Sequence, residues 1–321
     1  MHSERTEQQQ RDRIKGYRLC ERIGAGATGV VYAAERLADG LPVAIKMLRC
    51  AVASQPELSR RLLREAEVGR TVSHPGVPTT LAADRRPDGS PFLVMPRLTG
   101  SSLASLLRRG RIPDVPTIAA LAARVAEILH AVHVAGYTHR DVKPEHIVLE
   151  RDGDKRVRVY LIDFGVCASS RSSHEERELE RGKVFGTPSY VSPEQASGDP
   201  EVDGRADLFS LGLVIHEALT GRPVFEGGNV TKLLLRIIHQ DVPGLAEMLP
   251  NVDPEFARAA ATLLTRDRAQ RMPSARAAAR ALARFAGPNA RAHELLLALL
   301  ADQPIVVSAP AVLMPESLVA A

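Results

Sequence analysis

Cysteine is scarce in this sequence, and the few cysteines present are far apart. The 321 residues include three of them, Cys20, Cys50 and Cys167. An odd number of widely separated cysteines fits neither a disulfide framework nor the close spacing of zinc ligands. We therefore expect a protein of a reducing compartment, and the cytoplasm is the predicted location.

Long hydrophobic runs are also missing. Residues 1–16 begin MHSERTEQQQ and contain no apolar segment of the kind found in a signal peptide. Their charged, glutamine-rich composition predicts a disordered leader. We see no run of about 20 apolar residues further along the chain, so we expect no membrane span.

Aromatic residues make up only 4% of the chain, and 42 basic residues are balanced by 38 acidic ones. A nucleic-acid-binding surface usually combines a basic stripe with interleaved aromatic side chains. Here the net charge of +4 is mixed with acidic neighbours, so we expect no nucleic acid partner. The remaining composition, 45% hydrophobic and 25% charged, is typical of globular domains.

A β-rich pattern comes first in the chain. Residues 17–37, 41–48 and 92–98 carry short β-branched and apolar runs broken by glycine, proline and aspartate. These runs predict strands of an antiparallel sheet. Between them, residues 57–72 consist of good helix formers and predict one helix that ends before the turn at 74–76.

A helical pattern follows from about residue 114. Apolar residues between 118 and 132 recur at helical spacing and predict one buried stripe. Residues 146–150 and 156–163 predict two short strands joined by a turn. The polar residues 166–185 predict a mobile surface loop, and the segment 286–321 has one apolar stretch but no assignable structure. Further helices are predicted around 205–220, 230–239, 254–265 and 274–285.

Three glycines, Gly24, Gly26 and Gly29, have the spacing GxGxxG. Dinucleotide-binding folds use this spacing where a strand leads into a helix. Here residues 30–37 predict another strand, so the glycines would lie at a hairpin. A glycine-rich hairpin can bring backbone N–H groups close to phosphates because no side chain intervenes. A plain turn is the alternative.

A lysine stands near the end of the apolar strand at 41–48. Lys46 follows Val43, Ala44 and Ile45. A buried strand does not accommodate a lysine unless an anion or a carboxylate pairs with it. Glu65, on the helix predicted at 57–72, is the natural partner. The alternative is a lysine that reaches solvent beside a solvated glutamate.

The segments YTHRDVKPEHIVL (137–149) and YLIDFG (160–165) resemble the protein kinase family. Together with the glycine motif and Lys46, they belong to eight motifs in the family's order, covering about residues 17–285. The catalytic-loop sequence KPE and the later SPEQA are similar to those of bacterial serine/threonine kinases of the eukaryotic-like type. The other matching segments are HPG (74–76), GTPSYVSPE (186–194), GRADLFSLG (204–212) and Arg271.

This resemblance implies an α+β fold with two lobes. Residues 17–98 would form a small antiparallel β-rich lobe with one helix, and residues 99–285 a larger, mainly helical lobe. The implied reaction moves the γ-phosphate of ATP onto serine or threonine hydroxyls of protein substrates. The implied cofactor is Mg²⁺, with Mn²⁺ as the alternative. Such a transfer requires in-line positioning and neutralised charge more than covalent chemistry.

The resemblance also implies a role for each catalytic residue. Lys46, oriented by Glu65, would hold the α- and β-phosphates. Asp141 would accept the proton of the substrate hydroxyl as catalytic base, and Lys143 would meet the charge of the γ-phosphate. Asp163 would bind the metal that bridges the β- and γ-phosphates.

The nucleotide would lie between the lobes. Met95 would be the gatekeeper at the back of the adenine slot, the Pro96 carbonyl would accept a hydrogen bond from adenine, and the Leu98 N–H would donate one. The residues predicted to line the nucleotide site are Ile23, Gly24, Ala25, Gly26, Ala27, Thr28, Gly29, Val30, Val31, Ala44, Lys46, Met95, Pro96, Leu98 and Val148.

One position departs from the family pattern. His146 stands where the family has an asparagine that supplies an oxygen to a second metal ion. Magnesium prefers oxygen ligands, and an imidazole is a poor substitute. The substitution raises the alternative of an ATP-binding pseudokinase that regulates without transferring phosphate. A further alternative for His146 is a hydrogen bond to the catalytic-loop backbone, with one metal sufficing.

A third hypothesis is a phosphotransferase for small molecules with the kinase fold. Against it stands the segment 186–194, which resembles the peptide-substrate platform of protein kinases. Within it, Thr187 would contact Asp141.

Regulation is predicted from Arg140, which precedes the catalytic base. The resemblance implies that a phosphate on the loop could pair with this arginine and order the segment. The alternative is that the loop serines only solvate the surface. The candidate phosphorylation sites are Ser169, Ser170, Ser172 and Ser173, with Thr187 less favoured because of its place in the substrate platform.

Overall fold

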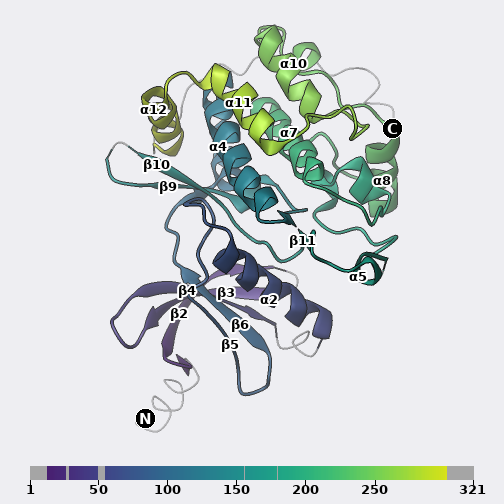
Figure 1. The fold of residues 1–321 in the computed structure, drawn as a ribbon. Coiled ribbons are helices and arrows are strands. Elements are labelled where there is room, and N and C mark those ends of the chain that lie inside the picture. The colour runs from purple at the N-terminus through teal and green to yellow at the C-terminus, as the bar shows by residue number, and fades with distance from the viewer. Residues whose placement is uncertain (1–12, 27–28, 50–54, 155, 179, 302–321) are drawn as a thin grey trace. The chain divides into compact units, whose positions relative to one another are not determined.

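The computed structural model describes residues 13–26, 29–49, 55–154, 156–178 and 180–301. It separates into two compact units, which are coloured along the chain in Figure 1. The first contains the chain up to residue 73 together with residues 77–99, and the second contains residues 74–76 and the chain from 100 onward. The division falls between Thr99 and Gly100. The turn at 74–76 is the exception, because it belongs to the second unit.

The first unit is an antiparallel sheet with a helix, as the sequence predicted. Strand order is β1-β2-β3-β4-β6-β5, and the helix is α2 (Pro56–Thr71). The strands are β1 (Arg13–Ile14), β2 (Tyr17–Ala25), β3 (Gly29–Arg36), β4 (Pro42–Leu48), β5 (Ala82–Arg85) and β6 (Pro91–Pro96).

The strand β1 corrects the prediction of a disordered leader through residue 16. Arg13 and Ile14 pair antiparallel with Arg18 and Tyr17 of β2. Ile14 is buried and packs with Val43 in the core. The ordered sheet therefore begins before residue 17, whereas residues 1–12 lie outside the described part of the chain.

Alternation along β4 divides its side chains between two faces of the sheet. Val43, Ile45 and Met47 enter one hydrophobic cluster. Leu48, on the other face, packs with Leu62 of α2. The even-numbered positions of β4 therefore face the helix, and Lys46 is one of them.

The second unit is mainly helical. Helix α4 (Val115–Val134) lies at its centre, with α7, α11 and α12 packed against it. The strands are β7 (Ser101–Ser102), β8 (Tyr137–Thr138), β9 (Ile147–Arg151), β10 (Val157–Leu161) and β11 (Ala168–Ser169). The helices and 3-10 turns are α3 (Leu103–Arg108), α4, η2 (Pro144–His146), α5 (His174–Glu178), η3 (Pro188–Tyr190), α6 (Pro193–Ala196), α7 (Arg205–Thr220), α8 (Val230–His239), α9 (Leu245–Met248), α10 (Pro254–Leu263), α11 (Ala275–Ala286) and α12 (Asn289–Leu300).

Helix α4 confirms the predicted apolar stripe. Its cap is Asp114, whose carboxylate accepts the Thr117 N–H at 3.0 Å. Ile118, Val125 and Leu129 have no measurable exposure. By length and composition alone, α4 could cross a membrane, and it is the one such helix among the described residues. In this fold 67% of that stretch is buried within the protein.

The loop at 166–185 and the segment after 285 both contain more structure than the sequence predicted. Strand β11 pairs antiparallel with β8, and α5 follows it. Helix α12 packs against α4, β9 and β10, with Leu296 and Leu299 fully buried. Part of the predicted extension is therefore integrated into the second unit.

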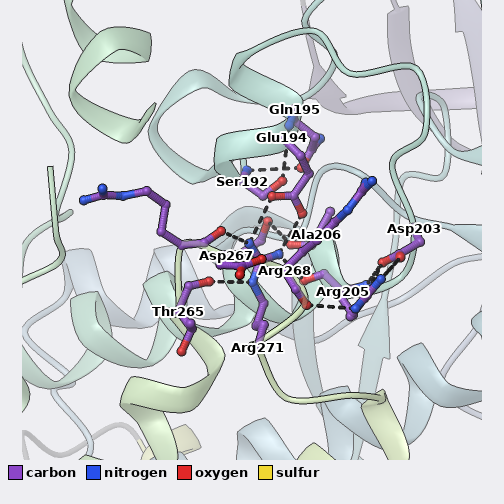
Figure 2. A network of polar contacts seen from close by, with 12 residues as sticks. Ser192, Glu194, Gln195, Asp203, Arg205, Ala206, Thr265, Asp267, Arg268 and Arg271 are labelled. Carbon is purple, nitrogen blue, oxygen red and sulfur yellow. Dashed lines mark hydrogen bonds and ion pairs between the residues drawn. The ribbon is translucent and has the colours of Figure 1, made fainter. Parts of the chain in front are cut away.

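A buried ion pair joins distant segments of this unit (Figure 2). The guanidinium of Arg271 donates to both carboxylate oxygens of Glu194, at 2.7 and 3.0 Å. Its other N–H groups donate to the carbonyls of Thr265, Arg205 and Arg266 at 2.8 to 3.0 Å. All five donors of this arginine are thus satisfied. The pair connects α6, which begins within the predicted substrate platform at 186–194, to the chain around residue 271.

Candidate active site

The glycine motif forms a hairpin, as predicted. Gly24 and Ala25 of β2 pair with Val31 and Val30 of β3. The Gly26 N–H donates to the Gly29 carbonyl at 2.9 Å and closes the turn. A side chain at Gly29 would approach the Met47 carbonyl to 3.2 Å, so the close packing of β3 on β4 favours glycine there. Ala27 and Thr28, the predicted tip of the hairpin, lie outside the described residues.

Lys46 and Glu65 meet on the helix-facing side of the sheet. The ammonium of Lys46 lies 2.7 Å from Glu65 Oε2. The two side chains are 19% and 8% exposed, so the pair is largely withdrawn from water. Burial makes each charge costly without its partner. The predicted pairing is present, and it fixes where the ammonium lies.

The remaining predicted nucleotide contacts of the first unit lie on neighbouring strands. Ala44 is buried opposite Met95, and Met95 also packs against the cluster beneath α2. Pro96 ends β6, opposite Val43. Leu98 is half-buried just beyond it, and Ile23 is 44% exposed on β2. Val148, the predicted contact from the second unit, is buried on β9.

In the second unit, a fully buried carboxylate sets the backbone of the catalytic loop. Asp207 on α7 accepts the backbone N–H of His139 at 2.9 Å and that of Arg140 at 2.8 Å. His133 Nε2 lies 2.8 Å from the same carboxylate. Burial alone would raise the pKa of Asp207, but these partners, His133 first among them, lower it. An ionised Asp207 therefore holds the loop in place, including the left-handed backbone of Arg140 (φ 66°).

Asp141 is held from two sides. Its Oδ1 accepts the Thr187 backbone N–H at 2.7 Å, and its Oδ2 accepts from Lys143 Nζ at 2.9 Å. Lys143 also donates to Thr187 Oγ1 at 2.5 Å. The predicted contact between Thr187 and Asp141 is thus present. Burial would raise the pKa of Asp141, but the nearby imidazole of His146, the ammonium of Lys143 and these hydrogen bonds lower it overall. The carboxylate is ionised and able to accept a proton.

His139 connects the catalytic loop to the Asp163 segment. Its Nδ1 accepts the Asp141 N–H at 3.2 Å, which leaves Nε2 to donate to the Ile162 carbonyl at 3.2 Å. The ring also packs against Phe164, with centroids 4.7 Å apart. Asp163, between Ile162 and Phe164, has a left-handed backbone (φ 66°). Such a conformation is costly for a non-glycine residue and is common at functional sites.

His146 lies between the two aspartates. Its Nδ1 is 2.9 Å from the Asp141 carbonyl oxygen, which can only accept, so Nδ1 carries the proton. Nε2 then presents its lone pair toward Asp163, 3.6 Å from Oδ2. Burial lowers the pKa of His146, although both aspartates oppose this effect. The neutral ring makes the predicted backbone hydrogen bond, and it also faces Asp163.

The residues present fit a metal held jointly with a nucleotide. Asp163 and His146 bring a carboxylate oxygen and a ring nitrogen together. Within the described part of the chain, no group of three or more histidine, cysteine, aspartate or glutamate side chains could hold a metal by itself. Mg²⁺ at phosphate sites usually takes one or two protein ligands and completes its shell with phosphates and water.

Arg140 is paired with a carboxylate of the loop. Its Nη1 lies 2.6 Å from Glu180 Oε2, and its guanidinium carbon is 5.6 Å from the centre of the Phe185 ring. Arg140 is 4% exposed. Its Nε has no hydrogen-bond partner among the described residues.

The loop serines have other contacts. Ser169 pairs with Tyr137 in the β8–β11 ladder, and the Ser170 N–H donates to the Gly136 carbonyl at 2.8 Å. The Ser172 N–H donates to the Ser169 carbonyl, and Ser173 is exposed beside α5. None of the described hydrogen bonds joins Arg140 to a serine of the loop. The acidic group that pairs with Arg140 is Glu180.

Sequence reasoning missed three positioning residues. Asp207 belongs to the GRADLFSLG segment, one of the motifs that resemble the protein kinase family. The motif did not reveal that Asp207 holds the backbone of the catalytic loop. Gln195 donates from Nε2 to the carbonyls of Arg140 and Phe185, at 2.9 and 3.0 Å. Glu180 had no sequence signal beyond the acidic character of its loop.

Comparisons with known proteins agree with this geometry. Residues 17–283 match the model of the protein kinase domain. The chain is 36% identical over 272 residues to the DNA damage-responsive serine/threonine-protein kinase RqkA of Deinococcus radiodurans, a match that covers 82% of this chain and 38% of that protein.

Two other relatives are similar over much of the chain. Identity is 32% over 240 residues with the serine/threonine-protein kinase PknH of Mycobacterium tuberculosis, covering 75% of this chain and 37% of PknH. It is 35% over 240 residues with the serine/threonine-protein kinase AfsK of Streptomyces coelicolor, covering 74% and 29%. The matched segment thus spans less than two-fifths of each of the three relatives.

Proposed function

Because the chain belongs to the protein kinase family, we propose that it is an ATP-dependent serine/threonine protein kinase of the eukaryotic-like bacterial type. The observation that carries this proposal is the pair of contacts at Asp141. The Thr187 N–H and Lys143 Nζ hold its two carboxylate oxygens. This places an ionised carboxylate next to the segment that resembles a peptide-substrate platform.

In the proposed reaction, the hydroxyl oxygen of a substrate serine or threonine attacks the γ-phosphorus of ATP. The bond from that phosphorus to the bridging oxygen of ADP breaks, and the hydroxyl proton passes to Asp141. Lys143 lies 2.9 Å from Asp141 and supplies positive charge beside the transferring group. The ordered carboxylate contributes both orientation and general-base catalysis.

The first unit supplies the nucleotide contacts in this proposal. Lys46, fixed by Glu65, binds the α- and β-phosphates, and the backbone of the glycine hairpin covers the triphosphate. Asp163, with His146 beside it, holds a divalent metal. A bound Mg²⁺ or Mn²⁺ supplies neutralisation of the phosphate charge. The adenine contacts assigned to Met95 and its neighbours remain part of the proposal.

The alternatives have less support. The relatives matched here carry the names of serine/threonine-protein kinases, and the comparisons offer nothing for a pseudokinase. A phosphotransferase for small molecules has no evident use for the contact between Thr187 and Asp141. We keep the cytoplasm as the proposed location, because the three cysteines are widely spaced.

For regulation, we infer that Glu180 supplies the negative charge that a phosphate was predicted to bring to Arg140. The carboxylate is 2.6 Å from the guanidinium. An ion pair of this kind orders a loop by the same physics as a phosphorylated residue. Phosphorylation of Ser169, Ser170, Ser172 or Ser173 would then act elsewhere on the loop.

The test is incubation of the purified protein with γ-labelled ATP, Mg²⁺ or Mn²⁺, and a generic acceptor protein. We expect label on the acceptor, recovered as phosphoserine or phosphothreonine after acid hydrolysis. A reaction without the divalent metal is the control. Label that never leaves the nucleotide would favour the pseudokinase, and label only on added small molecules would favour the third hypothesis.

A further inference from the structure

A cavity of about 910 Å³ lies in the second unit, away from the catalytic loop. Its walls come from the turn at 74–76, α4, the β9–β10 hairpin and α12. Figure 1 shows α12 beside the β9–β10 hairpin. Sites for small organic ligands usually have volumes of roughly 300–1,000 Å³. None of the residues assigned above to catalysis or nucleotide binding lines this cavity.

Arg124 on α4 brings a poorly compensated charge to this cavity. Its Nη2 donates to Asn289 Oδ1 at 2.8 Å and faces His293 Nε2 at 3.0 Å. Both partners are uncharged groups of α12, and no described carboxylate lies within ion-pair distance of Arg124. Burial lowers the pKa of the Arg124 guanidinium, and the more distant Glu127 offsets this only in part. The guanidinium therefore lacks an anionic partner here.

His293 faces two donors. Its Nδ1 lies 3.1 Å from the Val157 backbone N–H, and its Nε2 lies 3.0 Å from Arg124 Nη2. An arginine nitrogen and a backbone N–H can only donate. A neutral imidazole has one acceptor nitrogen, so one of these two contacts sets two N–H groups head to head. The Val157 N–H belongs to the backbone, so its direction is fixed by the chain and Nδ1 is the acceptor, which leaves the Nε2–H pointing at Arg124.

Positive charges on the remaining wall disfavour a second proton on His293. Burial first, and then the charges of Arg124 and Arg156, lower the pKa of His293. Arg156 lies on the exposed rim of the cavity. Arg158 is already neutralised by Asp152 at 2.8 Å. The two arginines whose positive charge acts on His293 are therefore Arg124 and Arg156.

The rest of the lining is different in character. The lining also includes apolar side chains, namely those of Ile128, Val157 and Leu297. Of the other carboxylates, Glu294 lies 3.7 Å from Arg291. Glu127 lies near enough to affect His74: burial lowers the pKa of His74, and the negative charge of Glu127 opposes this in part. A ligand that fits this lining has an anionic group at one end and an apolar body.

We propose that this cavity binds a small organic anion, with a phosphate or carboxylate group held by Arg124, Arg156 and the Nε2–H of His293. An anionic oxygen between Arg124 and His293 accepts from both and removes the head-to-head contact of their N–H groups. The apolar body packs against Ile128, Val157 and Leu297.

The proposal is tested by calorimetric titration of the full chain with phenyl phosphate, benzoate and inorganic phosphate as probes. We expect the wild type to bind phenyl phosphate or benzoate more tightly than inorganic phosphate, because only the first two have an apolar body. Binding of phenyl phosphate alone would assign the site to phosphate, and binding of benzoate to carboxylate. Arg124→Gln and Arg156→Gln should each weaken binding about tenfold, the loss of one charge-assisted hydrogen bond.

The matched control is Arg284→Gln, which removes the same charge from α11, where Arg284 pairs with Glu255 outside the cavity lining, and should leave binding unchanged. Nitrogen NMR of His293 adds a second readout: probe binding should shift the Nε2 resonance and leave the Nδ1 acceptor in place. Arg156 is exposed and makes no described side-chain hydrogen bond, so its variant tests the site even if Arg124→Gln fails to fold. No binding of any probe at millimolar concentration, or binding that neither variant weakens, would overturn the proposal.

Discussion

Arg271 and Arg140 are both buried in the second unit, with exposures of 2% and 4%, yet the structure satisfies them differently. Arg271 uses all five donors, two of them on Glu194 (Figure 2). Arg140 makes one ion pair, to the half-exposed Glu180, and its Nε has no described partner. A fully satisfied arginine has a single favourable arrangement, whereas Arg140 can exchange its partner at lower cost.

The comparison distinguishes two groups of residues, which we call the framework (Arg271 and Asp207) and the responsive face (Arg140 and His146). Arg271 and Asp207 fix the segments that carry the substrate platform and the catalytic loop, and each is fully satisfied by interior partners. Arg140 and His146 instead face the carboxylate of Glu180 on the loop and Asp163 of the proposed metal site. We therefore expect substitutions in the framework to lower stability, and substitutions at the responsive face to alter activity in a folded protein.

The largest effect is expected for Arg271→Met. It leaves Glu194 buried without a counter-charge, and breaking such a pair costs about 3–5 kcal/mol of unfolding free energy. Urea denaturation followed by circular dichroism measures this loss. Arg284→Met, which breaks an exposed pair with Glu255 at 3.3 Å, is the control and should change stability by less than about 1 kcal/mol. Similar losses of unfolding free energy in the two variants would contradict the distinction between the framework and the surface.

A smaller effect is expected for Glu180→Gln, and it should appear in turnover. The amide keeps the shape but removes the charge at Arg140, which weakens a charge-assisted hydrogen bond by about 1.4 kcal/mol, or tenfold in the population of the ordered loop. Initial-rate kinetics at saturating ATP measure it, with unfolding as the check on stability. The matched variant replaces Ser169, Ser170, Ser172 and Ser173 with alanine.

We expect that serine-to-alanine variant to keep most of the turnover, because Glu180 provides the charge. Mass spectrometry of residues 166–187 after incubation with ATP then shows whether the serines are modified at all. Full activity of Glu180→Gln, together with loss of activity in the serine variant, would mean that a phosphate on a loop serine supplies the negative charge at Arg140.

The smallest effect is expected for His146→Asn. An amide oxygen suits Mg²⁺ better than an imidazole nitrogen, so the Mg²⁺ concentration for half-maximal activity should fall several-fold. The Mn²⁺ requirement should change less, because that ion tolerates nitrogen ligands better. Metal titrations of both proteins at one fixed pH give the four values. Equal requirements in the two proteins would mean that His146 serves only the backbone of the catalytic loop.

Local patterns predicted the parts of this protein that depend on neighbours in sequence. The glycine hairpin followed from the strand after the glycines, and the Lys46–Glu65 pair followed from a lysine in an apolar strand. The stripe of α4 followed from its periodicity. Each of these three features depends on a short segment, and the pattern of residue types in that segment indicates the contacts that it makes.

Long-range contacts could not be predicted in this way. Asp207 receives hydrogen bonds from residues 67 and 68 positions earlier, and His293 meets Arg124 across 169 positions. Strand β1 has only two residues, too few for any periodic pattern. Glu180 is one acidic residue among several in a polar loop, and only the fold selects it as the partner of Arg140.

The central claim is that Asp141 serves as the base of a phosphotransferase, and Asp141→Asn tests it most directly. Calorimetry should show nucleotide binding close to that of the wild type, because the proposed nucleotide contacts lie elsewhere. Transfer of label from γ-labelled ATP to the acceptor protein should fall at least about 10²-fold, which corresponds to about 2.7 kcal/mol of transition-state stabilisation. Transfer at the wild-type rate by this variant would contradict the account.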